Sequence, residues 1–257
     1  TGVAQAKAAF SPVISIAGAI STEHEGKDAF QEVDQQSLFK PITKKTFTVR
    51  KTELIPQTLK KAFSLALTPR CGPVHLNFPR NILANICKFD EIQKHEKKSL
   101  SSIDENDLIN ILKIINKANR PVIIAGGGIK NSLSHETVLK ISTHLNIPIV
   151  SSAGHGDVIP SDEKLYAGQM GPRGNPVASK LVKDADVILA LGTRLGFNST
   201  FYSYDNINRE ADIIQIDIDK VSLGRYFPVT LGICSDVKDL AEKLFMKVKE
   251  KKIASSF

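Results

Sequence analysis

Several residue types that mark particular protein classes are scarce in this 257-residue sequence, which has no tryptophan and three cysteines. Three scattered cysteines are too few for a disulfide framework or a zinc site. A helix that crosses a bilayer needs about 20 consecutive apolar residues, and no run approaches that length. No secretory signal pattern is present either. We therefore expect a cytoplasmic protein with no membrane partner. The thiols, which we expect to be free, belong to Cys71, Cys87 and Cys234.

Positive charge is in modest excess, because the sequence has 34 Lys and Arg and 27 Asp and Glu, which gives a net charge of +7. Such an excess can indicate nucleic-acid binding. Here it lies largely in a polar segment and in the last helical pattern, and four tyrosines without tryptophan offer few rings for base stacking. We therefore expect no nucleic-acid partner. The lysines concerned are Lys94, Lys97, Lys98, Lys243, Lys247, Lys249, Lys251 and Lys252.

The common signatures of hydrolases and nucleotide triphosphatases are also missing. The sequence contains no H-E-x-x-H, no G-x-S-x-G and no G-x-x-x-x-G-K-[ST]. Its histidines show no metal-ligand spacing, so we expect no metal site, and we interpret His75 and His144 as structural. The six histidines are His24, His75, His95, His135, His144 and His155.

What is present is the pattern of an α/β protein in two units. With 42% hydrophobic residues the chain can bury a core and is not disordered. The first unit, residues 1–87, has strand patterns at 12–18 and 74–78, the latter alternating and ended by Pro79. Between them, residues 53–67 carry a helical apolar face. Its members are Ile55, Leu59, Ala62, Phe63 and Ala66.

A charged segment without periodicity, residues 88–102, predicts an interdomain linker. After it, residues 103–252 alternate between helix and strand, which predicts a parallel sheet of about six strands flanked by helices. We expect strands at 121–125, 148–151, 187–191, 212–217 and 229–234. We expect helices at 104–117, 134–145, 175–184 and, with Asp236 as the N-cap, in the last segment.

Three glycines follow the first strand of this second unit. Gly126, Gly127 and Gly128 end an apolar β-branched run, so they lie where ligands bind in open α/β sheets, outside the carboxyl ends of the strands. Their backbone N–H groups could cradle a phosphate or ribose. Equally, the glycines could serve a tight turn and close packing. The sequence is not the dinucleotide fingerprint, and both interpretations stay open.

Two further strand ends carry polar groups. Gly192 and Arg194 follow strand 187–191, where the arginine could clamp a phosphate. Asp217 ends strand 212–217 and Asp219 follows it, and both could accept hydrogen bonds from ribose or adenine. The alternatives are a salt bridge from Arg194 to Asp217 or Glu210, and a turn cap by Asp219.

The ordered set of these motifs resembles the central domain of thiamine-diphosphate-dependent enzymes of the acetolactate synthase group. An upstream block is similar to the end of the same family's pyrimidine-binding domain. The central motifs are residues 120–130, 168–174, 190–194, 213–219 and 232–236, and the upstream block runs from residues 26–32 to 72–80.

The resemblance implies a role for three upstream residues. Phe30 and Gln31 match the segment that faces the active-site channel, and Arg80 lies where the synthases usually carry a lysine at the channel mouth. A cation there suits an anionic substrate. The alternatives are core packing for Phe30 and a solvated loop position for Arg80.

The sequence departs from the synthases where they bind flavin. Leu195-Gly-Phe-Asn198 replaces their Phe-Asp-Asp-Arg, and Pro172-Arg-Gly174 replaces Met-His-Gly. These substitutions are more similar to the sulfoacetaldehyde acetyltransferase relatives, which use no flavin. The resemblance therefore implies ADP or FAD in the central domain, with ADP favoured. The implied cofactor residues are Gly126, Gly127, Gly128, Gly192, Arg194 and Asp217.

Two elements that thiamine catalysis needs lie outside the matched region. One is the glutamate that activates the cofactor, upstream of the segment matched by Thr1–Ala4. The other is a Gly-Asp-Gly motif, which occurs nowhere here, since Gly156-Asp157 is followed by Val158. The resemblance thus implies thiamine diphosphate and Mg²⁺ in the complete enzyme, with no catalytic residue and no metal ligand in this chain. A start at Thr1 rather than Met also indicates missing upstream sequence, so we expect an inactive fragment.

Three functions follow as hypotheses. The first is a piece of an acetolactate synthase-like enzyme, or of a sulfoacetaldehyde acetyltransferase-like one, that transfers a two-carbon unit from a 2-oxo acid or related small-molecule donor. Its partners would be the rest of the enzyme and a second subunit, in a homodimer or homotetramer. The others are a stand-alone nucleotide-binding module and a structural domain for dimerisation.

Overall fold

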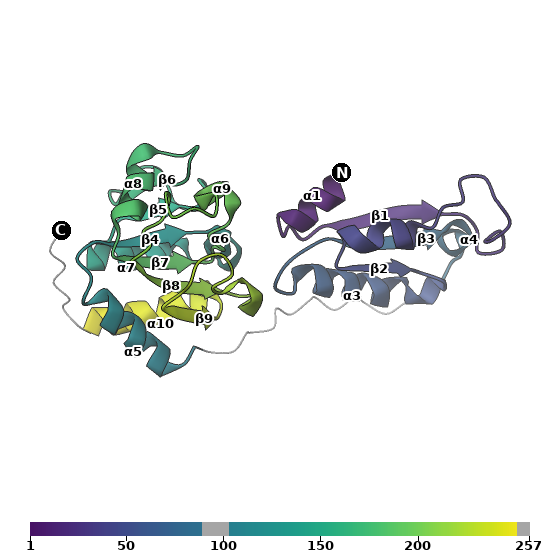
Figure 1. Cartoon of the computed structure of the whole chain (residues 1–257). Coiled ribbons are helices and arrows are strands. Elements are labelled where there is room, and N and C mark those ends of the chain that lie inside the picture. Colours follow the sequence, from purple (N-terminus) through teal and green to yellow (C-terminus); the bar gives the residue numbers. More distant parts are fainter. Residues whose placement is uncertain (89–102, 251–257) are drawn as a thin grey trace. The chain divides into compact units, whose positions relative to one another are not determined.

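The computed structural model describes residues 1–88 and 103–250, and the chain divides into two compact units, Thr1–Lys98 and Ser99–Phe257 (Figure 1). The predicted linker, residues 88–102, lies outside the described residues except for Lys88. Each unit is an α/β structure built on its own parallel sheet. In the part of the chain that is described, no helix is long and apolar enough to cross a membrane.

The first unit contains a three-stranded sheet in the order β1-β3-β2, with both pairs parallel. The strands are β1 (Ile14–Ala19), β2 (Lys45–Thr48) and β3 (Val74–Pro79). The helices are α1 (Gly2–Ala8), α2 (Gln35–Phe39), α3 (Ile55–Leu67) and α4 (Arg80–Ala84), with short 3-10 segments η1 (Lys40–Ile42) and η2 (Thr52–Leu54). The sequence pattern predicted β1, α3 and β3 and missed the others.

Two details of the prediction for this unit are wrong. The expected alternation in β3 is absent because all six residues are buried, as a central strand between two parallel neighbours requires. Pro79 does not end the pairing, since it is in register with Ala19. On α3 the apolar face is narrower than predicted: Ala62 and Ala66 are buried, whereas Phe63 is 49% exposed at the edge of that face.

The buried polar residues of β3 form a hydrogen-bonded chain across the sheet. His75 Nδ1 lies 2.9 Å from Ser15 Oγ, and His75 Nε2 lies 2.6 Å from Asn77 Oδ1. The Asn77 amide donates to Thr48 Oγ1 at 3.4 Å, so the chain connects all three strands. Phe39 stacks on the imidazole with ring centroids 3.7 Å apart. Because desolvation lowers the pKa of His75, the ring is neutral and its Nε2–H donates to Asn77.

The second unit contains a six-stranded sheet in the order β6-β5-β4-β7-β8-β9, and every pair is parallel, as predicted (Figure 1). The strands are β4 (Pro121–Ala125), β5 (Ile149–Ser151), β6 (Tyr166–Gln169), β7 (Val187–Leu191), β8 (Asp212–Asp217) and β9 (Leu231–Cys234). Five of them lie where the sequence pattern predicted strands. The edge strand β6 was missed because Tyr-Ala-Gly-Gln has no apolar run.

Helices cover both faces of this sheet. One face packs against α5 (Glu105–Ile115), α6 (Gly127–Ser132), α7 (His135–Leu145) and α10 (Val237–Glu250). The other packs against α8 (Pro176–Asp184) and the loops after β7 and β8, which include α9 (Phe197–Thr200) and η3 (Lys220–Ser222). As predicted, Asp236 caps α10, because its carboxylate accepts the Lys238 N–H at 2.9 Å. This two-sided cover explains why β4 and β7 read as continuous apolar runs.

Candidate functional site

The strand order of the second unit reverses between β4 and β7. The chain leaves β4 toward β5 and β6, and it leaves β7 toward β8 and β9, so the loops after these two neighbouring strands diverge. In open α/β sheets such a point, at the carboxyl ends of the strands, is where ligands bind. Gly126–Gly128 follow β4 and Gly192–Arg194 follow β7, so the sheet brings these two predicted motifs together.

The glycines at this point are packed backbone against backbone. A Cβ at Gly126 would lie 2.3 Å from the Gly192 carbonyl oxygen, and one at Gly128 would lie 2.5 Å from Gly192 Cα. Gly192 itself has φ +61°. The Gly126 N–H donates to Leu191 O at 2.9 Å and the Gly128 N–H to Gly192 O at 3.0 Å. The Gly192 N–H donates to Ile216 O at 2.8 Å. Packing thus accounts for Gly126, Gly128 and Gly192, and the N–H groups of all three are already hydrogen-bonded within the protein.

Gly127 has a different neighbour, His155, which the sequence pattern did not single out. A Cβ at Gly127 would lie 2.6 Å from His155 Cε1, so the imidazole occupies the space beside this glycine. His155 reaches this point from the loop after β5, where its N–H donates to Ser152 O at 3.0 Å. The spacing of the histidines in the sequence can indicate a metal site, but it does not indicate a histidine that is placed by packing against a glycine.

Burial and three charged neighbours act on the pKa of His155. Burial lowers the pKa of His155, the positive charges of Lys130 and Arg194 lower it further, and the Asp157 carboxylate opposes them. Lys130 and Asp157 form an ion pair, which holds the pKa of Asp157 below its usual value. The imidazole is therefore neutral at pH 7, with Arg194 as its cationic neighbour.

A buried glutamine holds the backbone beside Arg194 in place. Gln215 of β8 donates through Nε2 to Thr193 O at 3.0 Å and to Ser222 O at 3.3 Å. Its Oε1 accepts the Gly224 N–H at 2.8 Å. Arg194 itself is half-buried. The sequence pattern missed Gln215, because a single polar residue in the apolar strand 212–217 gives no sign of what it contacts.

Asp217 ends β8 at the same edge, but little of it is accessible. The residue is 6% exposed, and its Oδ1 accepts the Asp219 N–H at 2.9 Å. Asp219 in turn accepts the Val221 N–H at 3.0 Å, so it is a turn cap, which was the alternative interpretation from the sequence.

In the first unit, the three predicted channel residues are all at the surface. Phe30 is 88% exposed, so its interpretation as a core residue is wrong. Gln31 is exposed with φ +66°, and Arg80 is exposed at the start of α4. Glu32 organises the loop that carries Phe30: its carboxylate accepts the Gly26 N–H at 2.6 Å and the Ala29 N–H at 3.1 Å, and these bonds lower the pKa of Glu32.

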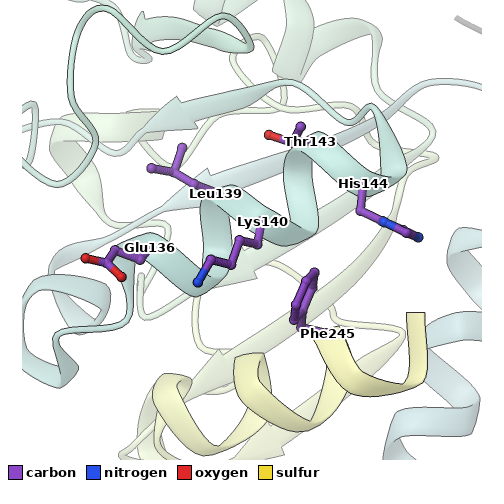
Figure 2. Close-up of a pocket in the computed structure, with 6 residues that line it drawn as sticks. All are labelled: Glu136, Leu139, Lys140, Thr143, His144 and Phe245. Carbon is purple, nitrogen blue, oxygen red and sulfur yellow. The ribbon is translucent and has the colours of Figure 1, made fainter. Parts of the chain in front are cut away.

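Two surface hollows lie elsewhere in the second unit. One, of about 460 Å³, lies between α7 and α10, where Phe245 points toward α7 (Figure 2). The other, of about 500 Å³, borders Lys130 and Asp157 beside the switch point. Neither is lined by Arg194 or the glycines. Among residues 1–88 and 103–250 no group of three His, Cys, Asp or Glu could hold a metal ion.

The six-stranded parallel sheet with helices on both faces and a reversal of strand order between β4 and β7 defines a doubly wound α/β domain. The family described as "Thiamine pyrophosphate enzyme, central domain" matches residues 108–244, which is more than half of the chain. The chain therefore belongs to the thiamine pyrophosphate enzyme family, through its central domain.

Acetolactate synthases are among the relatives of the chain. It is 34% identical to a probable acetolactate synthase large subunit of Methanocaldococcus jannaschii over 98% of the chain and 44% of that protein. It is 29% identical to the acetolactate synthase large subunit of Haemophilus influenzae over 99% of the chain and 45% of that protein. It is 30% identical to the isozyme 3 large subunit of Escherichia coli over 95% of the chain and 43% of that protein. The chain thus spans less than half the length of these curated relatives.

Proposed function

We propose that this chain is the middle part of a thiamine-diphosphate-dependent, acetolactate synthase-like enzyme that transfers a two-carbon unit from a 2-oxo acid. The observation that carries the proposal is a similarity to acetolactate synthases across 95–99% of the chain, both units included. In this proposal residues 1–87 are the end of the pyrimidine-binding domain and residues 103–252 are the central domain. A homodimer or homotetramer is part of the same proposal.

The residues of this chain do not fit thiamine diphosphate with its Mg²⁺. The sequence contains no Gly-Asp-Gly, and the described ranges contain no cluster of metal-binding side chains. We therefore assign no catalytic step to a residue of this chain. Phe30, Gln31 and Arg80 are proposed to face the substrate channel, which is consistent with their exposure. Arg80 would supply a positive charge for an anionic substrate.

The function is tested on the longer polypeptide that is encoded when the DNA flanking this sequence is included in the reading frame. Purified with thiamine diphosphate and Mg²⁺, it should convert pyruvate to acetolactate. Formation of acetyl phosphate and sulfite from sulfoacetaldehyde and phosphate, without carboligation of pyruvate, would favour the acetyltransferase-like alternative, to which Leu195-Gly-Phe-Asn198 points. Absence of both reactions in a folded protein would contradict the proposal.

For the central domain we propose an adenine nucleotide at the switch point between β4 and β7. The half-buried Arg194 beside a neutral His155 is suited to a phosphate, and Asp217 is the acidic group at the adjacent strand end for a ribose hydroxyl. Gly127 borders this point, while Gly126, Gly128 and Gly192 bring the two turns close together. Flavin is less favoured because Gly196 and Phe197 stand where the synthases carry acids. Equilibrium titration with ADP and with FAD tests this order, and tighter binding of FAD would reverse it.

A further inference from the structure

A long loop between β1 and α2 carries two of the three residues proposed to face the substrate channel. Residues 20–34 form neither helix nor strand. Loops longer than about 12–15 residues without secondary structure are uncommon, and they are usually either functional or disordered. Phe30 lies in this loop with 88% of its surface exposed, and Gln31 follows it. We call residues 20–34 the channel loop.

Phe30 and Gln31 are the two central residues of a β-turn that Glu32 closes. The Glu32 N–H donates to Ala29 O at 2.9 Å, and the Glu32 carboxylate accepts the Ala29 N–H at 3.1 Å. The other carboxylate oxygen accepts the Gly26 N–H at 2.6 Å. One side chain thus fixes both the turn and the backbone that precedes it.

Gln31 has a backbone conformation that glutamine does not favour. Its φ is +66°, and a β-turn with positive φ at its third position usually has glycine or asparagine there. Other residues keep this conformation only where their surroundings determine it, and they cluster at active sites and ligand clamps. Because Phe30 is exposed, burial of its ring does not order the turn. The hydrogen bonds of Glu32 do so instead.

Two further contacts tie the channel loop to the ends of neighbouring strands. The Thr22 N–H donates to Asn81 Oδ1 at 3.1 Å, and the Asn81 amide donates to Thr22 Oγ1 at 2.8 Å. Asn81 directly follows Arg80, so this pair joins the loop to the segment that carries the third proposed channel residue. Arg50, which follows β2, donates through Nη1 to Glu25 Oε2 at 2.8 Å. The loop is therefore ordered, not merely long.

We propose that Glu32 is a positioning residue, which holds Phe30 and Gln31 in the conformation that meets the substrate in the longer enzyme. The proposal rests on the proposed function and adds the group that fixes the channel residues. The hydrogen bonds from the Gly26 and Ala29 N–H groups lower the pKa of Glu32, so both of its oxygens remain acceptors at neutral pH. A turn that is ordered before the substrate arrives lowers the entropy lost on binding.

The first measurement follows the turn itself, on the full chain. Glu32→Gln keeps the size of the side chain but replaces one acceptor oxygen with an NH2 group. Amide hydrogen exchange at Gly26 or Ala29 should then become about two- to tenfold faster, the range for one hydrogen bond. Glu23→Gln removes the same charge from the same loop and is the matched control. Within residues 1–88 and 103–250 the Glu23 carboxylate makes no hydrogen bond or ion pair.

The second measurement is acetolactate formation from pyruvate by the longer polypeptide. Glu32→Gln should lower kcat/KM by about ten- to a hundredfold, the scale for a substrate misplaced by about 1 Å. Glu23→Gln should leave kcat/KM unchanged. In a Phe30→Ala background, Glu32→Gln should lower kcat/KM by a smaller factor, because two changes that act through the same ring are not additive. A loss of general stability would not depend on the presence of the ring.

The outcomes separate this inference from the proposed function. If the wild-type longer polypeptide forms acetolactate and Glu32→Gln retains its kcat/KM, the turn positions nothing and the inference is wrong. The inference is also wrong if Glu32→Gln lowers kcat/KM by the same factor with and without the Phe30 ring, or if hydrogen exchange at both Gly26 and Ala29 is unchanged. If the folded wild-type polypeptide forms no product, the proposed function is wrong and this inference falls with it.

Discussion

The imidazole of His155 occupies the space that a side chain at Gly127 would fill, with a Cβ there 2.6 Å from His155 Cε1. Gly127→Ala therefore forces the ring to move. We expect the free energy of unfolding to fall by about 1–3 kcal/mol, the range for overpacking a well-packed site. Urea unfolding followed by circular dichroism measures it. Gly156→Ala is the control, because the nearest atom to its Cβ would be 3.6 Å away; equal losses in both variants would contradict the contact.

A methyl group at Gly128 meets an obstacle that cannot move. Its Cβ would lie 2.5 Å from Gly192 Cα, and backbone does not rotate away as an imidazole does. We expect Gly128→Ala to lose more stability than Gly127→Ala, at or above about 3 kcal/mol. The same urea experiment compares them, and a smaller loss at Gly128 would show that the two turns do not pack as described.

Two histidines that are wholly or partly buried, His75 and His155, make stability depend on pH in the acid range. Burial lowers the pKa of both His75 and His155 in the folded chain, whereas an unfolded histidine titrates near about 6.5. As the pH falls, the histidines of the unfolded chain bind protons at a higher pH than those of the folded chain. The stabilisation is therefore complete above about pH 6.5 and is lost as the pH falls below that value. The free energy of unfolding, measured by urea denaturation, should therefore be smaller at pH 5.5 than at pH 7.5.

His75→Gln isolates the part of this dependence that arises in the first unit. A glutamine amide can both donate and accept, so it can replace the bonds to Asn77 and Ser15 without titrating. We expect the variant to lose less stability than the wild type between the two pH values. If the variant and the wild type lose the same free energy of unfolding between the two pH values, His75 does not contribute to the pH dependence.

Catalytic silence of the isolated chain is also testable. The sequence lacks the Gly-Asp-Gly motif, so we expect thiamine diphosphate to bind weakly or not at all in the presence of Mg²⁺. Calorimetric titration measures this, with Mg²⁺ alone as the blank. A micromolar dissociation constant, about −8 kcal/mol of binding free energy, would show that the chain holds the cofactor by residues we have not identified.

Much of the central sheet could be predicted from the sequence because its strands are buried on both faces. Short apolar β-branched runs such as those of β4 and β7, each followed by glycine, favour a strand in a covered parallel sheet over a buried helix. The half-buried β2 and β6 lack that signal and were missed. The motifs of the candidate site could be predicted because they directly follow these recognisable strands. The parallel topology brings the carboxyl ends of the strands together at one edge of the sheet.

The parts of the site that could not be predicted depend on tertiary contacts. His155 is placed by packing against Gly127, and Gln215 by carbonyls and an N–H from two other loops. None of these contacts follows a sequence period, and the contact of Gln215 with Thr193 spans 22 residues. The ring contact between Tyr202 and Tyr226 likewise joins a residue after β7 to one after β8, and only the fold brings these two loops together.

The most direct test of the central claim is whether Arg194 binds a nucleotide at the switch point. ADP at a hundredfold excess over its dissociation constant should stabilise the wild-type chain by about 2.7 kcal/mol, seen as a rise in melting temperature. Arg194→Ala should weaken ADP binding by roughly 1.5–3 kcal/mol, the scale of a charge-assisted hydrogen bond. Arg120→Ala, at the exposed residue before β4 at the opposite end of the sheet, should leave it unchanged. If saturating ADP leaves the melting temperature of the wild-type chain unchanged, the switch point binds no nucleotide and its glycines serve packing alone.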